Sequence, residues 1–395
     1  MKILHLNGAA SGGGIEQYLG QLFKELGSRG HQNLLIYGDR APEDAFSKEE
    51  ARHIEGITRV ACGDLDTKIE KVKEIFKSYD PDLVFVHQVL NAALIDFVTR
   101  RKPSIRFAHG YKLICPDGRK TLKSEGRLCG YPLGYSCQIH AYQYRCMPRD
   151  PFKGFRLLRN SKRIVRMHRQ RSHMVVASSF MKSMLLQNGF EEDRISIIPY
   201  FTHAPDSVDY PPINAEPLII CVGRVIKEKG MHHLIKALSS VHQRARLIIV
   251  GDGPDLKGLE GLGKDLGLSE RIDFKGWLSH DRLDRLYREC SIAVVPSVWP
   301  EPFGIVGIEA MAYQRPVIAC NVGGISDWLN HEENGFLVKV GDEGAIAEKI
   351  NFLIENPEAA KRMGEEARVF AKNRFSVEAH MGPLLSLFKK LTGDL

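Results

Sequence analysis

The chain has 395 residues, of which 43% are hydrophobic and 26% are charged. This balance is typical of a soluble globular protein and excludes a disordered or fibrous chain, and the length predicts two or three domains. No apolar run approaches the roughly 18 residues that a membrane-spanning helix needs. The first residues also lack the apolar core of a signal peptide, so we expect a cytoplasmic protein.

The positive charge is concentrated in one segment. The net charge is +7, but residues 151–190 contain nine Lys or Arg and no Asp or Glu, which more than accounts for the excess. Basic residues recur there on one face of a predicted helix, opposite an apolar face: Arg159, Lys162, Arg163, Arg166 and Arg169. A basic amphipathic helix over 153–171 predicts contact with an anionic membrane surface, and hence a peripheral protein on its inner face. A solvated helix face is the alternative. Nucleic acid is not expected, because no aromatic interleaving or recognition motif accompanies the charge.

The first 100 residues alternate between two periods. Strand-like apolar runs occupy 2–6, 33–37 and 83–87, and helical spacing of apolar residues occupies 15–26 and 69–75. Repeated strand–helix alternation predicts a parallel sheet that is covered by helices.

A second series of strands begins near residue 217, with apolar runs at 218–222, 247–250, 292–295 and 317–319. Before it, residues 201–217 hold four prolines and no clear period, which predicts a linker. We therefore predict two doubly wound α/β domains, 1–205 and 215–375, that face an interdomain cleft. In such sheets, ligands bind beyond the carboxyl ends of the strands.

Several strand ends in the second half carry groups that suit a nucleotide diphosphate. Pro302 predicts the first turn of a helix, so the N–H groups of Phe303, Gly304 and Ile305 would face a phosphate. Arg224 and Lys229, which follow the strand at 218–222, would supply positive charge. Glu301 and Glu309 are poor phosphate ligands but good acceptors for hydroxyl groups, as on a sugar and a ribose.

These segments, in this order and spacing, resemble the nucleotide-binding half of glycosyltransferase family 4, a retaining family with the GT-B fold. The matching segments are GRVIKEKG, GDGP, EPFGIVGIEAMA, PVIA, GG and NGFLV. The resemblance implies that Arg224 and Lys229 hold the donor diphosphate. It also implies that Glu309 binds ribose hydroxyls and Glu301 binds the transferred sugar. Ser326-Asp327 stands where the family often has Pro-Glu, which we interpret as a packing variation.

The resemblance is thinner in the first half. Gly13 and Gly14 lie in a loop similar to one that touches the donor phosphates in the family, although Gln17 stands where a basic residue is frequent. The family often carries a histidine at a strand end corresponding to His109. This implies contact with the donor sugar or shielding of charge near its reacting carbon, rather than base catalysis. An ordinary βα turn and a structural histidine are the alternatives. The fold also implies that a final helix, 376–395, packs back on the first domain.

Four cysteines lie within 32 residues, in a predicted insertion over 115–146: Cys115, Cys129, Cys137 and Cys146. Clustered thiols in a reducing compartment favour a structural tetrahedral zinc, although no tight C-x2-C pair is present. No bound metal and disulfides are the alternatives. Two Asp-x-Asp pairs, Asp64/Asp66 and Asp80/Asp82, are better explained by turns than by a metal. No catalytic metal is expected, because cations and N–H groups can stabilise a leaving diphosphate instead.

The sequence as a whole predicts a retaining hexosyltransferase. Its donor would be a UDP- or GDP-sugar and its acceptor a hydroxyl of a glycan or lipid-linked molecule, as in the assembly of a cell-surface polysaccharide. A nucleotide-sugar epimerase of the same fold and a non-catalytic protein that binds membranes or nucleic acid are the alternatives. A nicotinamide-dependent oxidoreductase is disfavoured because the dinucleotide fingerprint is absent.

Overall fold

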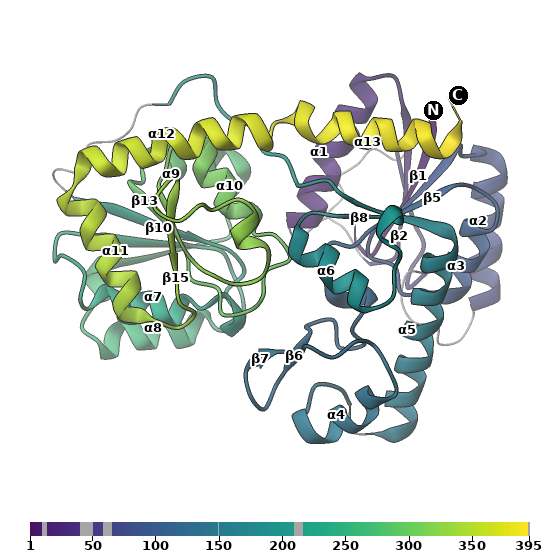
Figure 1. Ribbon diagram of the computed structural model, residues 1–395, viewed down its shortest axis with the longest axis horizontal. Coiled ribbons are helices and arrows are strands. Elements are labelled where there is room, and N and C mark those ends of the chain that lie inside the picture. The colour runs from purple at the N-terminus through teal and green to yellow at the C-terminus, as the bar shows by residue number, and fades with distance from the viewer. Residues whose placement is uncertain (10–13, 40–49, 58–64, 149, 209–215, 394–395) are drawn as a thin grey trace. The chain divides into compact units, whose positions relative to one another are not determined.

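The computed structural model describes residues 1–9, 14–39, 50–57, 65–148, 150–208 and 216–393 (Figure 1). The chain divides into two compact units, one formed by 1–199 with 381–395 and the other by 200–380. The division falls before the linker expected at 201–217. Residues 202–207 are bound to the second unit, where Thr202 N–H donates to Phe375 O at 2.8 Å and Arg288 Nη1 donates to Ser207 O at 3.2 Å.

The first unit is built on a parallel sheet in the order β3-β2-β1-β4-β5-β8-β9. Its strands are β1 (Lys2–Asn7), β2 (Gln32–Tyr37), β3 (Ala51–His53), β4 (Leu83–Val86), β5 (Ser104–Phe107), β8 (Ser172–Val176) and β9 (Ile195–Ile197). Its helices are α1 (Gly14–Ser28), α2 (Leu65–Tyr79), α3 (Ala92–Thr99), α4 (Ser136–Tyr144), α5 (Pro151–Arg171) and α6 (Ser179–Gln187). A short hairpin of β6 (Thr121–Leu122) and β7 (Arg127–Leu128) lies in the predicted insertion.

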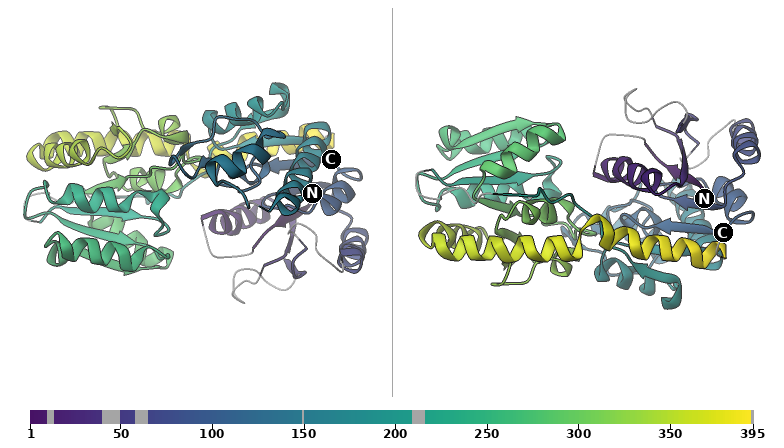
Figure 2. Two further views of the ribbon diagram at one scale, coloured as in Figure 1. Left: turned by 90° about the horizontal axis from the view of Figure 1, so that it is seen from below. Right: turned by 90° about the horizontal axis from the view of Figure 1, so that it is seen from above.

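The second unit is built on a six-stranded parallel sheet in the order β12-β11-β10-β13-β14-β15. Its strands are β10 (Leu218–Val222), β11 (Arg246–Val250), β12 (Ile272–Gly276), β13 (Ile292–Val295), β14 (Val317–Cys320) and β15 (Gly335–Val338). Its helices are α7 (Met231–Leu238), α8 (Leu256–Asp265), α9 (His280–Glu289), α10 (Ile305–Ala312), α11 (Glu343–Glu355) and α12 (Pro357–Arg374). In Figure 1, α12 and α10 lie above this sheet and α7 and α8 lie below it, so both faces are covered. Figure 2 shows the same layers from two further sides.

The strand predictions agree best where a strand is buried on both faces. The expected strands at 218–222 and 292–295 coincide with β10 and β13 residue for residue. The two parallel α/β units of the predicted fold class are confirmed. The apolar pattern does not reveal β12, because this edge strand is only partly buried and has no continuous apolar run. Nor does it reveal β8, which begins directly after the basic helix α5 with no turn residue between them.

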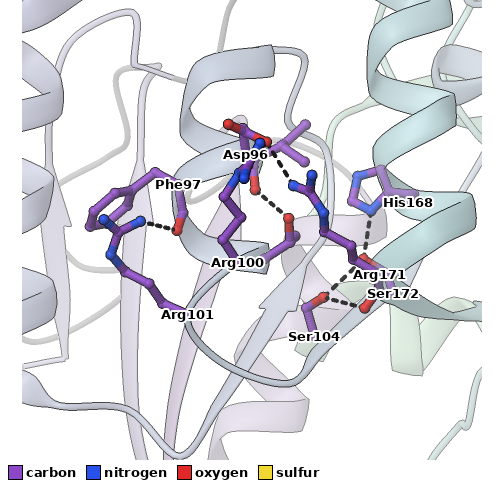
Figure 3. A network of polar contacts seen from close by, with 10 residues as sticks. Asp96, Phe97, Arg100, Arg101, Ser104, His168, Arg171 and Ser172 are labelled. Carbon is purple, nitrogen blue, oxygen red and sulfur yellow. Dashed lines mark hydrogen bonds and ion pairs between the residues drawn. The ribbon is translucent and has the colours of Figure 1, made fainter.

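A polar network fastens α5 to the sheet of the first unit (Figure 3). Arg171, the last residue of α5, donates to the Asp96 carboxylate of α3 at 2.6 Å, and Arg100 donates to the same carboxylate at 3.0 Å. The hydroxyls of Ser104 on β5 and Ser172 on β8 lie 2.9 Å apart. The Ser172 hydroxyl is also 2.9 Å from Nδ1 of His168 on α5. These contacts hold the C-terminal end of the basic helix α5 in place.

The last helix, α13 (Val377–Thr392), passes from the second unit into the first. Its part in the first unit buries an apolar stripe that includes Leu384 and Phe388, which are both 0% exposed. The Phe388 ring lies edge-on to Phe85 of β4, with 5.9 Å between the ring centroids. The final helix is therefore part of the first unit's core from Met381 onward.

Candidate functional site

The strand order of the second unit places one ligand-binding position on its sheet. The order reverses between β10 and β13, because the chain first adds β11 and β12 on one side and later adds β13 to β15 on the other. Loops that leave two adjacent parallel strands in opposite directions open a crevice at their carboxyl ends, where nucleotides bind in sheets of this order. The loops after β10 and β13 carry Lys229 and Glu301.

Lys229 and Glu301 meet at this switch point. Lys229 Nζ lies 2.6 Å from Glu301 Oε1, and the Ser297 hydroxyl donates to the same oxygen at 2.6 Å. Glu301 is only 4% exposed. A carboxylate in such a place needs partners for its charge, and Lys229 and Ser297 provide them.

The two loops that hold this pair are pressed together. The N–H groups of Val298 and Trp299 donate to Glu228 O, both at 3.1 Å. Gly230 ends the 3-10 turn Lys227–Lys229 with a φ of 67°. A side chain at Gly230 would collide with the carbonyl oxygen of Pro296. Only glycine permits this approach, so the backbone itself sets the distance between Lys229 and Glu301.

Arg224 lies in the same loop but is exposed. It follows β10, and its side chain makes no hydrogen bond or ion pair with any residue that the structure describes. The backbone around it is held closely, since a side chain at Gly251 would collide with the carbonyl oxygen of Gly223. Arg224 therefore presents an uncommitted positive charge at the carboxyl edge of the sheet.

The helix after Glu301 starts later than expected. α10 begins at Ile305, after Gly304 with a φ of 97°, so Pro302 lies before the helix rather than in its first turn. This corrects the sequence prediction. The reason is Trp328, a fully buried side chain whose Nε1–H donates to Phe303 O at 2.7 Å. That bond holds Phe303 in the core and outside the helix.

The amide groups expected to face a phosphate keep this capacity despite the later start. No hydrogen bond joins the backbone N–H of Phe303 or Gly304 to any part of the chain that the structure describes. Ile305 is the first residue of α10, and the first N–H groups of a helix have no partner inside the helix.

Glu309 occupies the first turns of α10. The Tyr287 hydroxyl on α9 donates to Glu309 Oε2 at 3.2 Å. Burial raises the pKa of the Glu309 carboxyl, and the hydrogen bond from Tyr287 partly offsets this effect. The second unit thus brings Arg224, Lys229, Glu301, Glu309 and the start of α10 to one edge of its sheet, as the sequence predicts.

His109 belongs to the first unit and is 7% exposed. Its ring stacks on Phe107, with 4.1 Å between centroids, and lies edge-on to Tyr18 of α1 at 5.8 Å. Nε2 of His109 lies 2.9 Å from Nδ1 of His87, which directly follows β4. Burial and the nearby Arg106 guanidinium hold the pKa of His109 well below its usual range, so its ring is neutral.

The glycine loop of the first unit is only partly described. Gly14 is the first residue of α1 and is exposed. Gly13 lies outside the described residues, as does Asp64. Asp80 forms an ion pair with Lys102 at 2.9 Å, and Asp82 accepts the backbone N–H of Lys2 at 2.7 Å. Asp80 and Asp82 therefore have structural partners at the turn before β4.

The zinc site expected at the four cysteines stays a prediction. Cys115, Cys129, Cys137 and Cys146 are all half-buried free thiols. Within the described ranges, no group of three or more His, Cys, Asp or Glu side chains could hold a metal ion. The cysteines come from four separate pieces of chain: a turn before β6, the end of the hairpin, α4, and the loop after α4.

Burial, and then the neighbouring thiols, raise the pKa of Cys146 to about 11. The other three thiols therefore lie close enough to Cys146 to act on its charge.

The expected basic helix is present but its accessible surface differs from the prediction. α5 buries Leu158, Ile164 and Val165 and exposes Arg159, Arg163, Arg166 and Arg169. Lys162 is instead covered, since its Nζ lies 3.4 Å from the centre of the Tyr135 ring. In the part of the chain that can be described, no helix is both long and apolar enough to cross a membrane.

Sequence reasoning missed the side chains that support the predicted site. Ser297 and Tyr287 bind the two glutamates, and Trp328 sets the start of α10. The sequence indicates these residues only weakly, because each is a single polar or aromatic residue within an apolar pattern. His87 could have been found more easily, since it follows a predicted strand, as His109 does.

Comparison with known proteins places the chain in a family. Residues 207–370 match the family described as Glycosyl transferases group 1, and residues 12–202 match Glycosyltransferase Family 4. The two matches are complementary and together take in nearly the whole chain. The chain belongs to glycosyltransferase family 4, and its fold is GT-B.

Individual relatives agree with this assignment. An uncharacterized glycosyltransferase of Methanocaldococcus jannaschii is 40% identical over 134 residues, which are 33% of this chain and 34% of that protein. A GDP-mannose-dependent phosphatidylinositol monomannoside mannosyltransferase of Mycobacterium tuberculosis is 30% identical over 40% of this chain and 43% of its own length. The chain thus spans less than half the length of these two curated relatives.

Among solved structures, Anabaena HepE in complex with UDP and glucose superposes with a TM-score of 0.74. The alignment covers 98% of this chain and 99% of HepE at 20% identity. At this identity the likeness concerns the fold alone.

Proposed function

We propose that this protein is a hexosyltransferase that moves a hexosyl group from a nucleotide-diphosphate sugar to an acceptor hydroxyl with retention of configuration. The observation that carries the proposal is the Lys229–Glu301 pair at the switch point of the second unit, beside the exposed Arg224 and the amides at 303–305. The carboxyl edge of the second unit's sheet thus presents cations that suit a diphosphate and a carboxylate that suits hydroxyl groups.

In the proposed reaction, the bond between the anomeric carbon and the diphosphate oxygen breaks, and the acceptor oxygen bonds to the same face of that carbon. The proton of the acceptor hydroxyl leaves with the diphosphate. Arg224, Lys229 and the amides stabilise the negative charge that develops on the leaving oxygen. Glu301 accepts hydrogen bonds from the sugar, Glu309 binds the ribose hydroxyls, and His109 contacts the donor sugar. The Gly13–Gly14 loop contacts the donor phosphates.

The donor we propose is a UDP- or GDP-sugar. HepE is a structural neighbour that binds UDP and glucose, and the mycobacterial relative is GDP-mannose-dependent. The same relative is a phosphatidylinositol monomannoside mannosyltransferase, which supports a glycan or lipid-linked acceptor. We place the reaction in cell-surface polysaccharide assembly, on the cytoplasmic face of a membrane.

A surface of the first unit supports contact with that membrane. Six large apolar or aromatic side chains between residues 131 and 155 are at least 41% exposed: Tyr131, Tyr135, Ile139, Tyr142, Phe152 and Phe155. Arg145, Lys153 and Arg156 lie among them and are also exposed. They belong to α4, the loops on either side of it and the first turns of α5, and Figure 1 shows these elements next to one another. Aromatic rings with interspersed cations suit the boundary of an anionic bilayer, so we centre the contact here and on the first turns of α5.

Thermal-shift measurements with UDP, GDP, UDP-glucose and GDP-mannose, each with and without EDTA, test the donor proposal. We expect one nucleotide and its sugar conjugate to raise the melting temperature, to the same extent in EDTA. The accepted donor is then incubated with glycolipid acceptors, and the product is examined by NMR for its anomeric configuration. No shift with any of these nucleotides would overturn the proposal. An epimerised nucleotide sugar formed without acceptor would identify an epimerase instead.

A further inference from the structure

The carboxylate of Glu309 is held by only one of its two oxygens. The Tyr287 hydroxyl lies 3.2 Å from Oε2, whereas Oε1 has no hydrogen bond or ion pair with any residue that the structure describes. Glu309 is half-buried, and Oε1 is not among the buried polar atoms that lack a partner, so this oxygen is accessible. An ionised carboxylate only accepts hydrogen bonds, and Oε1 is therefore left to accept them from a ligand.

Tyr287 belongs to a stack of two tyrosines that bind different carboxylates. Its ring is 3% exposed and stacks on Tyr313, which directly follows α10, with 5.3 Å between the ring centroids and 22° between their planes. The Tyr313 hydroxyl donates to Asp284 Oδ1 on α9. Asp284 has a second partner in Arg288, whose Nε donates to Oδ2 at 3.0 Å. In this stack, the hydroxyl that reaches Glu309 is that of Tyr287.

The single proton of the Tyr287 hydroxyl has two acceptors within reach, and both lie on α10. They are Glu309 Oε2 at 3.2 Å and Val306 O at 3.5 Å. The carboxylate is the nearer acceptor, and a charged acceptor makes the stronger hydrogen bond. The terminal torsion of a glutamate is otherwise broad, so the bond to Oε2 restricts where Oε1 points.

We propose that Tyr287 is a positioning residue that holds Oε2 of Glu309 and thereby presents Oε1 to the ribose hydroxyls of the donor nucleotide. The inference rests on the proposed function, in which Glu309 binds the ribose, and it names the residue on which that contact depends. Because Tyr287 is buried, it acts through Glu309. The residues concerned all belong to the second unit.

Two variants that each remove one hydroxyl test this role. Tyr287→Phe keeps the ring and its stacking but frees the Glu309 carboxylate. We expect the contribution of the ribose hydroxyls to nucleotide affinity to fall about fivefold, the value of one hydrogen bond. Tyr313→Phe is the matched control, because it removes the hydroxyl of the other ring in the stack and leaves Asp284 bound to Arg288. It should not change the contribution of the ribose.

The measurement is calorimetry on the full-length protein with UDP and GDP and with their 2′,3′-dideoxy forms, which lack both ribose hydroxyls. The ratio of the two dissociation constants gives the contribution of these hydroxyls. We expect a wild-type ratio above about tenfold, since hydrogen bonds to a charged group are the stronger ones. Glu309→Ala should bring the ratio close to one. Adding Tyr287→Phe to Glu309→Ala should change it no further, because Tyr287 acts through Glu309.

Two results would overturn the inference and leave the proposed function standing. In one, Glu309→Ala lowers the ratio but Tyr287→Phe does not. In the other, Tyr287→Phe weakens the binding of the ribose and dideoxy forms equally, which would make Tyr287 a purely structural residue. Failure of the proposed function looks different, and the inference would fail with it. The wild type would then bind neither UDP nor GDP, or Glu309→Ala would keep the wild-type ratio.

Discussion

The two units have the same strand order around their switch points, but the side chains at these points are charged in one unit and neutral in the other. In the second unit, the strands β10 and β13 lead to Lys229 and Glu301, a charged pair supported by a serine. In the first unit, the equivalent strands β1 and β4 carry His5 and His87, two neutral rings in contact. The topology supplies a place for a ligand, and the side chains at that place decide which ligand group it suits.

The difference suits two kinds of ligand group. A diphosphate carries charge and needs cations and free amides. A sugar is uncharged and is bound by groups that donate or accept single hydrogen bonds. Glycines bring the loops of the second unit together, as at Gly230, whereas aromatic packing by Phe107 and Tyr18 confines His109 in the first. The charged and neutral sites should therefore respond differently to substitution and to pH.

The largest expected effect concerns Glu301. Glu301→Ala should reduce turnover of the nucleotide sugar by about a thousandfold, as when a group that acts on the reacting centre is lost, and leave nucleotide affinity largely intact. Released nucleotide measures turnover, and calorimetry with the bare nucleotide measures affinity. Glu333→Ala, an exposed glutamate in the same unit, is the control. Equal losses of turnover and affinity would contradict the assigned role, because Glu301 would then act only by holding Lys229.

The sequence could predict the charged site but not its support. The site residues follow buried strands that the sequence shows as clear apolar runs, and the carboxyl ends of parallel strands lie at the same edge of a sheet. These residues are Arg224, Lys229, Glu301 and Glu309. The start of α10 could not be predicted, because Trp328, 25 residues after Phe303, decides it through a tertiary hydrogen bond. The zinc site stays a prediction, because spacing along the chain brings four thiols into one insertion but does not fix their orientation.

The second prediction concerns acid stability. Burial lowers the pKa of His5 to about 3 and that of His173 to about 4, below the ordinary value near 6.5. The unfolded chain therefore takes up protons first, and the stability of the first unit is lost as the pH falls below about 6.5. For His5 the loss at pH 5 is about 2 kcal/mol. The second unit has fewer such groups, since His380 is its one buried histidine among the described residues.

Spectroscopy can separate the two units, because Trp277, Trp299 and Trp328 all lie in the second. Denaturant unfolding is followed at pH 7 and pH 5 by far-UV circular dichroism, which reports both units, and by tryptophan emission, which reports one. At pH 5 we expect part of the dichroism signal to be lost at lower denaturant than the emission signal. Transitions that move together between the two pH values would show that the buried histidines do not make the first unit acid-sensitive.

The third prediction concerns the uncommitted charge of the second unit. Arg224→Ala should weaken nucleotide diphosphate binding by about tenfold, because one charge-assisted hydrogen bond is lost, with little change in melting temperature. Arg246→Ala is the matched control, an exposed arginine that begins β11 at the opposite edge of the same sheet. A similar loss of affinity in both variants would indicate a general charge effect rather than a phosphate contact.

The smallest expected effect concerns the exposed aromatic surface of the first unit. Phe152 and Phe155 are 86% and 50% exposed at the start of α5, so replacing both with Ser removes apolar area without opening a core. We expect binding to vesicles of phosphatidylcholine with phosphatidylglycerol to fall about fivefold in a sedimentation assay, since little of each ring enters the boundary. Trp277→Ser, which removes a 75% exposed aromatic residue from the second unit, should have no effect.

Binding that persists in the double variant and is lost in high salt would assign the contact to the α5 arginines alone, because such charge attraction is screened. If all variants bind neutral phosphatidylcholine vesicles as strongly as they bind the anionic vesicles, an anionic surface is excluded as the partner.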